Sequence, residues 1–125
     1  MLQQEKPEDF VLATGITTTI RDFVKMSFAE LGIELAFRGK YEAEEGYIIK
    51  NNSEYKLEEG KVVIKVDPKY FRPTEVDLLI GDPTKSKTQL NWKPKYDLKA
   101  LVNEMVNADI LRIKNEILLK NAANI

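Results

Sequence analysis

The stretch KVVIKVDPKYFRPTEV (residues 61–76) joins a strong strand pattern to a run of charged and aromatic side chains. Residues 61–66 are rich in β-branched side chains, which predicts a strand. Arg72 stands directly before Pro73, and the residue before a proline is biased toward extended backbone. We therefore expect Arg72 to project from a stiff, non-helical segment just after this strand.

Arg72 and Glu75 are three residues apart and suit two different parts of a nucleotide. The planar guanidinium of Arg72 matches a diphosphate, whereas an ionised Glu75 accepts hydrogen bonds from paired ribose hydroxyls. The same spacing also fits an ion pair between Arg72 and Glu75 on a surface turn, so spacing alone leaves both interpretations open. Tyr70 and Phe71 could stack on a base, but aromatic residues at the end of a strand often belong to the core.

The residues before this stretch alternate between helix and strand patterns. The apolar run at residues 10–13 predicts a buried strand. Apolar residues at helical spacing between Ile20 and Leu31 predict an amphipathic helix that ends at Gly32, and residues 33–38 alternate as a strand does. Arg21, near the start of that helix, is either solvated or able to reach a phosphate beside the free amides of the first turn.

The remaining segments predict one exposed excursion and two helices. Residues 39–60 are polar and indicate an exposed loop or a hairpin built on residues 47–49, with solvated charges at Glu44 and Glu45. Asp82 precedes a proline and is expected to cap a short helix, and Asp97 is expected to cap the last helix. Residues 110–125 are interpreted as a polar helical tail.

Composition narrows the class of protein. A chain of 125 residues with 43% apolar and 31% charged residues fits a single globular domain. The net charge of -1 gives no electrostatic reason to expect nucleic acid. The absence of cysteine and histidine argues against disulfides and the usual metal sites, so we expect no metal. No apolar run approaches the roughly 20 residues of a membrane span, and we expect a cytoplasmic protein without a membrane contact.

Motifs of cofactor enzymes are missing from this sequence. It has no glycine-rich fingerprint after a strand, no phosphate-binding loop and no tyrosine followed by lysine four residues later. We therefore expect neither a cofactor site nor catalytic residues within this chain.

Four segments together resemble one known family. They are PEDFVLATG (residues 7–15), IRDFV (20–24), VDPKYFRPTEVDLLIGDPTKSKTQLNWKP (66–94) and EMV (104–106). They are similar to the C-terminal part of the GDP-mannose 4,6-dehydratase family, within the extended short-chain dehydrogenase/reductase superfamily. Residues 41–59 depart most from the family pattern.

The resemblance implies an α/β fold that forms a small C-terminal substrate-binding subdomain, with the Rossmann domain absent from this chain. In the family, a Rossmann domain holds NADP and the catalytic residues, and GDP-mannose is converted to GDP-4-dehydro-6-deoxy-D-mannose. The resemblance assigns Arg72 to the diphosphate, Glu75 to the ribose and Tyr70 to the surroundings of the nucleotide. Arg21 matches a family position without an assigned role.

The resemblance further implies that this chain is inactive alone. Its expected partners are GDP-mannose or GDP, the Rossmann domain in cis or in trans, and further copies of the full-length protein in a homo-oligomer. Two alternatives stay open, namely a separate subunit that completes a split enzyme and a non-functional truncated fragment.

Overall fold

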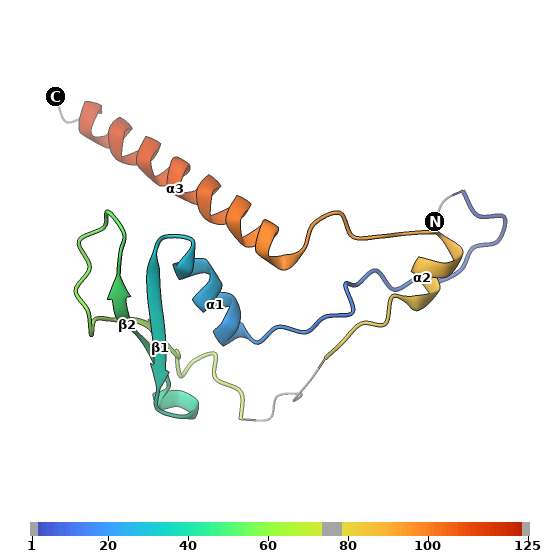
Figure 1. The fold of residues 1–125 in the computed structure, drawn as a ribbon, viewed down its shortest axis with the longest axis horizontal. Helices are drawn as coiled ribbons and strands as arrows, with labels where there is room; N and C mark the ends of the chain where they lie inside the picture. Colours follow the sequence, from blue (N-terminus) through green and yellow to red (C-terminus); the bar gives the residue numbers. More distant parts are fainter. Residues whose placement is uncertain (1–2, 74–78, 124–125) are drawn as a thin grey trace.

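The computed structural model describes residues 3–73 and 79–123 and contains helices and one sheet, as an α/β chain should. The sheet is antiparallel throughout. The elements in chain order are α1 (Ile20–Ala29), β1 (Ile33–Arg38), the 3-10 turn η1 (Tyr41–Ala43), β2 (Glu45–Asn51), β3 (Val62–Lys65), α2 (Thr84–Gln89) and α3 (Leu98–Ala123) (Figure 1).

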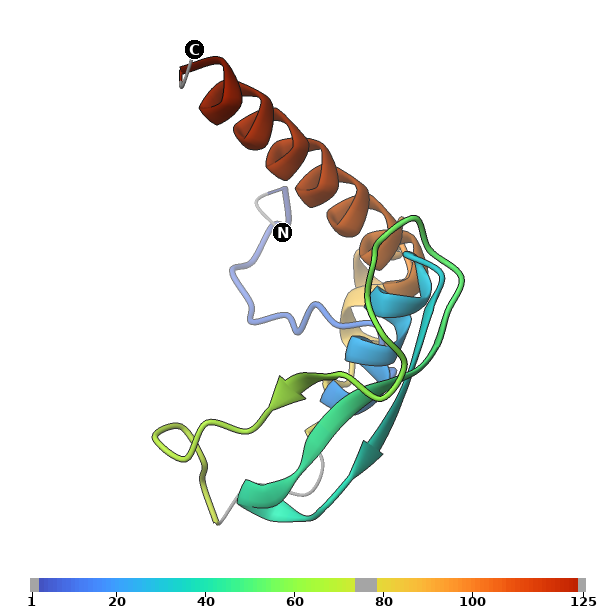
Figure 2. The ribbon, with the colours of Figure 1, turned by 90° about the vertical axis from the view of Figure 1, so that its left-hand side faces the viewer.

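The sheet and α1 form the best-packed part of the molecule. The strands lie in the order β1-β2-β3, and α1 contacts β1 (Figure 2). The core consists of Ile33, Leu35 and Ile48, of which Ile48 has no exposed surface. The alternation predicted for residues 33–38 is confirmed, since Ile33 and Leu35 are buried and Glu34 is exposed.

Helix α1 begins where the sequence predicts, but it ends at Ala29, before Leu31 and Gly32, which form a turn. The Thr19 hydroxyl accepts a hydrogen bond from the Asp22 amide at 3.0 Å and so satisfies one of the free donors of the first turn. Gly32 follows the helix with a φ of +78°, a conformation that favours glycine. The chain then reverses directly into β1.

Residues 39–60 are less exposed than the sequence predicts, although they contribute to a hairpin. They contain β2, which is the central strand of the sheet and carries the fully buried Ile48. The pairing of β2 with β1 does create a hairpin, closed by η1. The polar composition of this segment suggested that it is exposed. Only alternate side chains of a strand face the core, however, so the buried Ile48 can anchor β2 within a mainly polar segment.

The strand predicted at residues 10–13 is wrong. This segment has no regular secondary structure, and Val11 and Leu12 are 53% and 49% exposed. It runs beside α2, where the buried Ser86 hydroxyl donates a hydrogen bond to the Val11 carbonyl and Lys85 Nζ donates to the Asp9 carbonyl at 3.0 Å. A strand requires a neighbouring strand for its amides, and α2 offers side chains instead.

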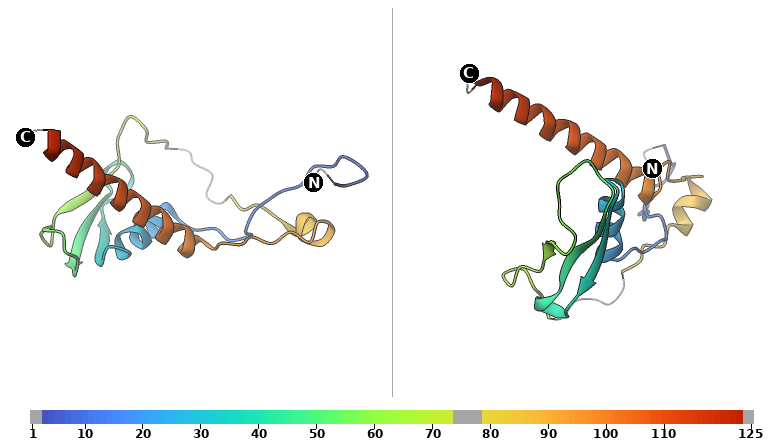
Figure 3. Two further views of the ribbon diagram at one scale, coloured as in Figure 1. Left: turned by 90° about the horizontal axis from the view of Figure 1, so that it is seen from above. Right: turned by 60° about the vertical axis from the view of Figure 1, so that its left-hand side comes forward.

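The last helix continues far beyond the packed part of the molecule. Asp97 caps α3 as predicted, because its Oδ1 accepts a hydrogen bond from the Ala100 amide at 2.8 Å. Near its start, α3 packs against α1 and buries Val102. Its second half contacts the β2–β3 connection through an exposed ion pair, in which Lys114 Nζ donates to Glu54 Oε1 at 3.2 Å, and the end of the helix projects beyond the sheet (Figures 1 and 3). This half is not wholly polar, since it exposes Leu111 and Leu118. Within the described ranges, no helix has the length and apolarity needed to cross a membrane.

Candidate functional site

An open hollow of about 500 Å³ lies at the rim of the sheet, where the N-terminal turn of α1 meets the β1–β2 turn. Its walls come from four parts of the chain. They are α1 (Arg21), the turn after β1 (Gly39, Lys40, Tyr41, Glu44), the residue after β3 (Val66) and the residue directly before Arg72 (Phe71). The fold thus places Arg21 beside the segment that carries Arg72.

Arg21 is paired with a glutamate on the facing turn. Its Nε donates a hydrogen bond to Glu44 Oε1 at 2.8 Å, and its Nη2 donates to the same oxygen. The Arg21 side chain is 53% exposed and that of Glu44 is 24% exposed, so the pair lies at the surface but on the wall of the hollow. Both donors share one carboxylate oxygen, and such charge-assisted hydrogen bonds are stronger than neutral ones.

The ring of Phe37 supports two cations of α1. The Arg21 guanidinium carbon lies 5.6 Å from the ring centroid and Lys25 Nζ lies 5.8 Å from it. The ring fits there because residue 46 is a glycine, and a Cβ at Gly46 would stand 3.0 Å from the ring. These contacts concentrate positive charge at this rim, partly balanced by Glu44.

The segment that carries Arg72 begins with a hydrogen-bonded turn. The Asp67 carbonyl accepts from the amides of Tyr70 and Phe71 at 3.0 and 3.1 Å, and Asp67 Oδ1 accepts from the Lys69 amide at 2.9 Å. Phe71 is half-buried against the hollow, and Arg72 follows it. These hydrogen bonds therefore fix the backbone that leads into Arg72.

The predicted site residues are placed as follows. Arg72 is exposed to solvent and does not line the hollow, and Tyr70 is 71% exposed with Lys69 Nζ 5.3 Å from its ring centroid. Arg21 lines the hollow, together with the residue that precedes Arg72. Glu75 lies outside the described residues, so its position relative to Arg72 stays a prediction.

Glu44 and Glu45 are not the solvated loop charges that were expected. Glu44 accepts from Arg21, and Glu45 Oε1 accepts from Arg38 Nε at 2.7 Å. Strand register explains the second pair, because Arg38 and Glu45 stand opposite each other in the ladder. No sequence signal reveals the first pair, since 23 residues separate its members and only packing of α1 on the sheet brings them together.

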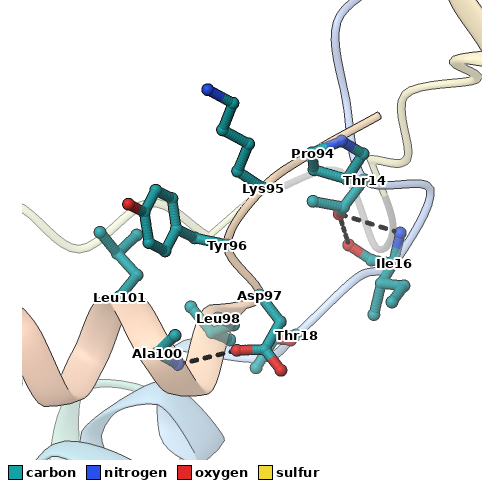
Figure 4. A pocket seen from close by; sticks show the side chains of 10 residues that line it. All are labelled: Thr14, Ile16, Thr18, Pro94, Lys95, Tyr96, Asp97, Leu98, Ala100 and Leu101. Atoms are coloured by element: carbon teal, nitrogen blue, oxygen red, sulfur yellow. Dashed lines mark hydrogen bonds between the residues drawn. The ribbon is translucent and has the colours of Figure 1, made fainter. Parts of the chain in front are cut away.

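A second hollow of about 710 Å³ lies between the N-terminal segment and the start of α3 (Figure 4). Its walls are mainly apolar and include Ile16, Pro94 and Leu101. The Thr14 hydroxyl and the Asp97 carboxylate at its edge are engaged in local hydrogen bonds within their own turns (Figure 4). Of the predicted site residues that the structure describes, namely Arg21, Tyr70 and Arg72, none lines this hollow.

Comparison with known proteins decides the family. A model of the family described as GDP-mannose 4,6 dehydratase matches residues 1–105 of this chain. The chain belongs to the GDP-mannose 4,6-dehydratase family. The matched range includes all three strands, α1, α2 and the start of α3, as well as each of the four predicted site residues.

Individual relatives agree with the family match. The chain is 54% identical over 115 residues to the GDP-mannose 4,6 dehydratase of Dictyostelium discoideum, which covers 92% of the chain and 30% of that relative. It is 49% identical over 110 residues to the human GDP-mannose 4,6 dehydratase, covering 88% of the chain and 27% of the relative. The GDP-mannose 4,6-dehydratase of Yersinia enterocolitica is 46% identical over 122 residues, which is 96% of the chain and 33% of the relative. The chain therefore spans about a third or less of the length of these relatives.

The described part of this GDP-mannose 4,6-dehydratase family member does not fit NADP. A dinucleotide site needs parallel strands and a glycine-rich turn between a strand and a helix. Here the sheet is antiparallel, and α1 is preceded by residues 14–19, which form no strand. The described residues therefore do not form a dinucleotide site of this kind.

Proposed function

We propose that this chain is the GDP-sugar-binding part of a GDP-mannose 4,6-dehydratase, with Arg72 as the ligand of the diphosphate and Glu75 as the ligand of the ribose. The observation that carries the proposal is the family match over residues 1–105, which includes the whole VDPKYFRPTEV segment. In this proposal the complete enzyme converts GDP-mannose to GDP-4-dehydro-6-deoxy-D-mannose with NADP. Tyr70 lies beside the bound nucleotide.

The surroundings of Arg72 support its proposed role. The guanidinium is exposed and follows a hydrogen-bonded turn, so an incoming diphosphate does not have to displace the core to reach it. The neighbouring rim carries Arg21, Lys25 and Lys40 against the carboxylate of Glu44, and the remaining positive charge favours an anion. An arginine at this place keeps its charge over the whole neutral pH range.

The large accessible surface of the chain supports the proposal that a further domain packs against it. Its accessible surface is 10658 Å². A compact protein of 125 residues exposes only about 6,800 Å². We propose that the NADP-binding Rossmann domain of the family, in cis or in trans, covers part of the excess and supplies the catalytic residues. By itself the chain then binds nucleotide weakly and does not turn over GDP-mannose.

Calorimetric titration of GDP into the chain tests the proposed role of Arg72. We expect Arg72→Ala to weaken GDP binding by about 10- to 100-fold, since hydrogen bonds to charged groups contribute about 1.5–3 kcal/mol. Arg72→Ala should reduce the affinity for GMP less than the affinity for GDP, because the proposed contact is to the diphosphate. Arg112→Ala, which removes another exposed guanidinium far along α3, should leave both affinities unchanged.

Two results would contradict the proposal. Equal affinity of wild type and Arg72→Ala for GDP would remove Arg72 from the site. An equal loss in the Arg72 and Arg112 variants would show that binding reflects general positive charge and no defined ligand.

A further inference from the structure

Arg21 stands at an unfavourable place for a cation. It is the second residue of α1, where the helix dipole favours negative charge. Helix stability therefore does not explain an arginine there. The contacts that it makes outside the helix, to Glu44 and to the Phe37 ring, are the better explanation.

Glu44 connects Arg21 to the segment that carries Arg72. Its carboxylate accepts from Arg21, while its backbone carbonyl accepts from the Val66 amide at 3.4 Å. The β2–β3 ladder starts at the next residue, where Glu45 stands opposite Lys65. Glu44 is thus the point at which α1, the β1–β2 turn and the end of β3 meet.

The path from Val66 to Arg72 is short and ordered. Asp67 follows Val66 directly and closes the turn with the Tyr70 and Phe71 amides. Phe71 returns to the same hollow that Arg21 and Glu44 line. A shift of Glu44 would therefore act on the start of the turn that precedes Arg72, through the Val66 amide, and on the wall that its end faces.

We propose that Arg21 is a positioning residue, which acts through Glu44 to hold the end of β3 and the Asp67 turn and thereby sets the place of Arg72. This inference rests on the proposed function, because it takes Arg72 as the ligand of the diphosphate. It assigns Arg21 no direct contact with the nucleotide. Its guanidinium is engaged by Glu44 and would have to leave that carboxylate to bind a phosphate.

Amide hydrogen exchange of the nucleotide-free chain, followed by NMR, tests the structural half of the inference. We expect Arg21→Met to speed exchange of the Val66, Tyr70 and Phe71 amides by about fivefold, the size expected for loss of one partly exposed ion pair. Exchange of the β1 amides should stay unchanged. Glu44→Gln, which keeps an acceptor for Arg21 but removes the charge, should have a smaller effect on the same amides.

The pair formed by Arg38 and Glu45 provides a matched control. Its side chains are 58% and 25% exposed, close to the 53% and 24% of Arg21 and Glu44. It joins β1 to β2 and lies next to the same ladder end, since Glu45 stands opposite Lys65, but neither of its residues lines the hollow. Arg38→Met should therefore leave exchange of the Val66, Tyr70 and Phe71 amides at the wild-type rate.

GDP affinity tests the functional half. Arg21→Met should weaken GDP binding by about fivefold. In an Arg72→Ala background the same change should have no further effect, because Arg21 acts through Arg72. The charge-exchanged double variant, Arg21→Glu with Glu44→Arg, should recover both GDP affinity and slow amide exchange.

The outcomes separate this inference from the proposed function. Additive losses in Arg21→Met and Arg72→Ala, with unchanged amide exchange, would make Arg21 a direct ligand and overturn the inference. A second outcome is faster exchange in Arg21→Met at these amides alone, with a GDP affinity that Arg72→Ala leaves unchanged. It would confirm that Arg21 stabilises the turn and would refute the role of Arg72. Unchanged exchange in Arg21→Met would overturn the inference whatever the affinities are.

Discussion

Gly39 and Gly60 have nearly the same backbone conformation and very different surroundings. Their φ angles are +82° and +85°, in the region that favours glycine. A Cβ added at Gly39 would stand 2.1 Å from the Ala43 carbonyl oxygen, whereas one at Gly60 would meet no atom within 4 Å. Gly39 is therefore required both by its conformation and by the closely packed β1–β2 turn that walls the hollow.

This comparison predicts unequal effects of the same substitution. Gly60→Ala should lower the free energy of unfolding by about 1 kcal/mol, the cost of a left-handed alanine. Gly39→Ala should cost at least about twice as much, because backbone of η1 must also move. Urea unfolding of the two variants checks this, and equal losses would show that the turn relaxes without cost.

At the scale of the element, α2 depends on the carboxylate that precedes it. Asp82 Oδ1 accepts hydrogen bonds from the Thr84 amide at 2.9 Å and from the Thr84 hydroxyl at 2.5 Å. These two hydrogen bonds, the hydroxyl first, and the charge of Lys87 lower the pKa of Asp82 below its ordinary value of 3.8. The sequence predicted Asp82 as the N-cap and Pro83 as the first helical residue. In the structure α2 begins at Thr84 with Pro83 in the N-cap position, so Asp82 holds the start of the helix from one residue further back.

The lowered pKa predicts how the contribution of Asp82 depends on pH. A carboxylate whose pKa is depressed in the folded state stabilises the fold above its unfolded pKa, and the contribution is lost as the pH falls through the folded value. The advantage of wild type over Asp82→Asn, which keeps an acceptor but no charge, should therefore be constant near pH 6 and decline as the pH falls below the ordinary value of 3.8. Urea unfolding of both proteins from about pH 6 downward through this value measures it. An advantage that grows on acidification would contradict the assignment.

At the scale of the whole molecule, packing is concentrated at one end. The sheet, α1 and the start of α3 share the core, while α2 and the N-terminal segment lie at the other end of an extended chain (Figure 3). Apolar side chains remain exposed between these parts, including Ile16, Ile20 and Leu79 at 76%, 78% and 79%. Exposure of this extent is typical of a surface that another part of a protein covers.

The exposed apolar surface predicts marginal stability of the chain alone. We expect a broad thermal transition and strong binding of a hydrophobic dye below that transition. Differential scanning fluorimetry measures both. A sharp transition well above about 60 °C would contradict this expectation.

The sequence by itself determined the elements whose causes are local. The apolar spacing and the Thr19 cap define α1, Gly32 reverses the chain in the turn after it, and Asp82 and Asp97 mark the starts of α2 and α3. Each of these signals acts within a few residues, so it is readable without the fold.

Only the tertiary structure decided which distant residues meet. It made β2 the central strand, left residues 10–13 without strand neighbours, and brought Arg21 to Glu44. The physical reason is that strand pairing and ion pairs between elements depend on register and packing direction, which local side-chain patterns do not specify. The meeting of α1 with the β1–β2 turn, and with it the hollow beside the Arg72 segment, belongs to this second group.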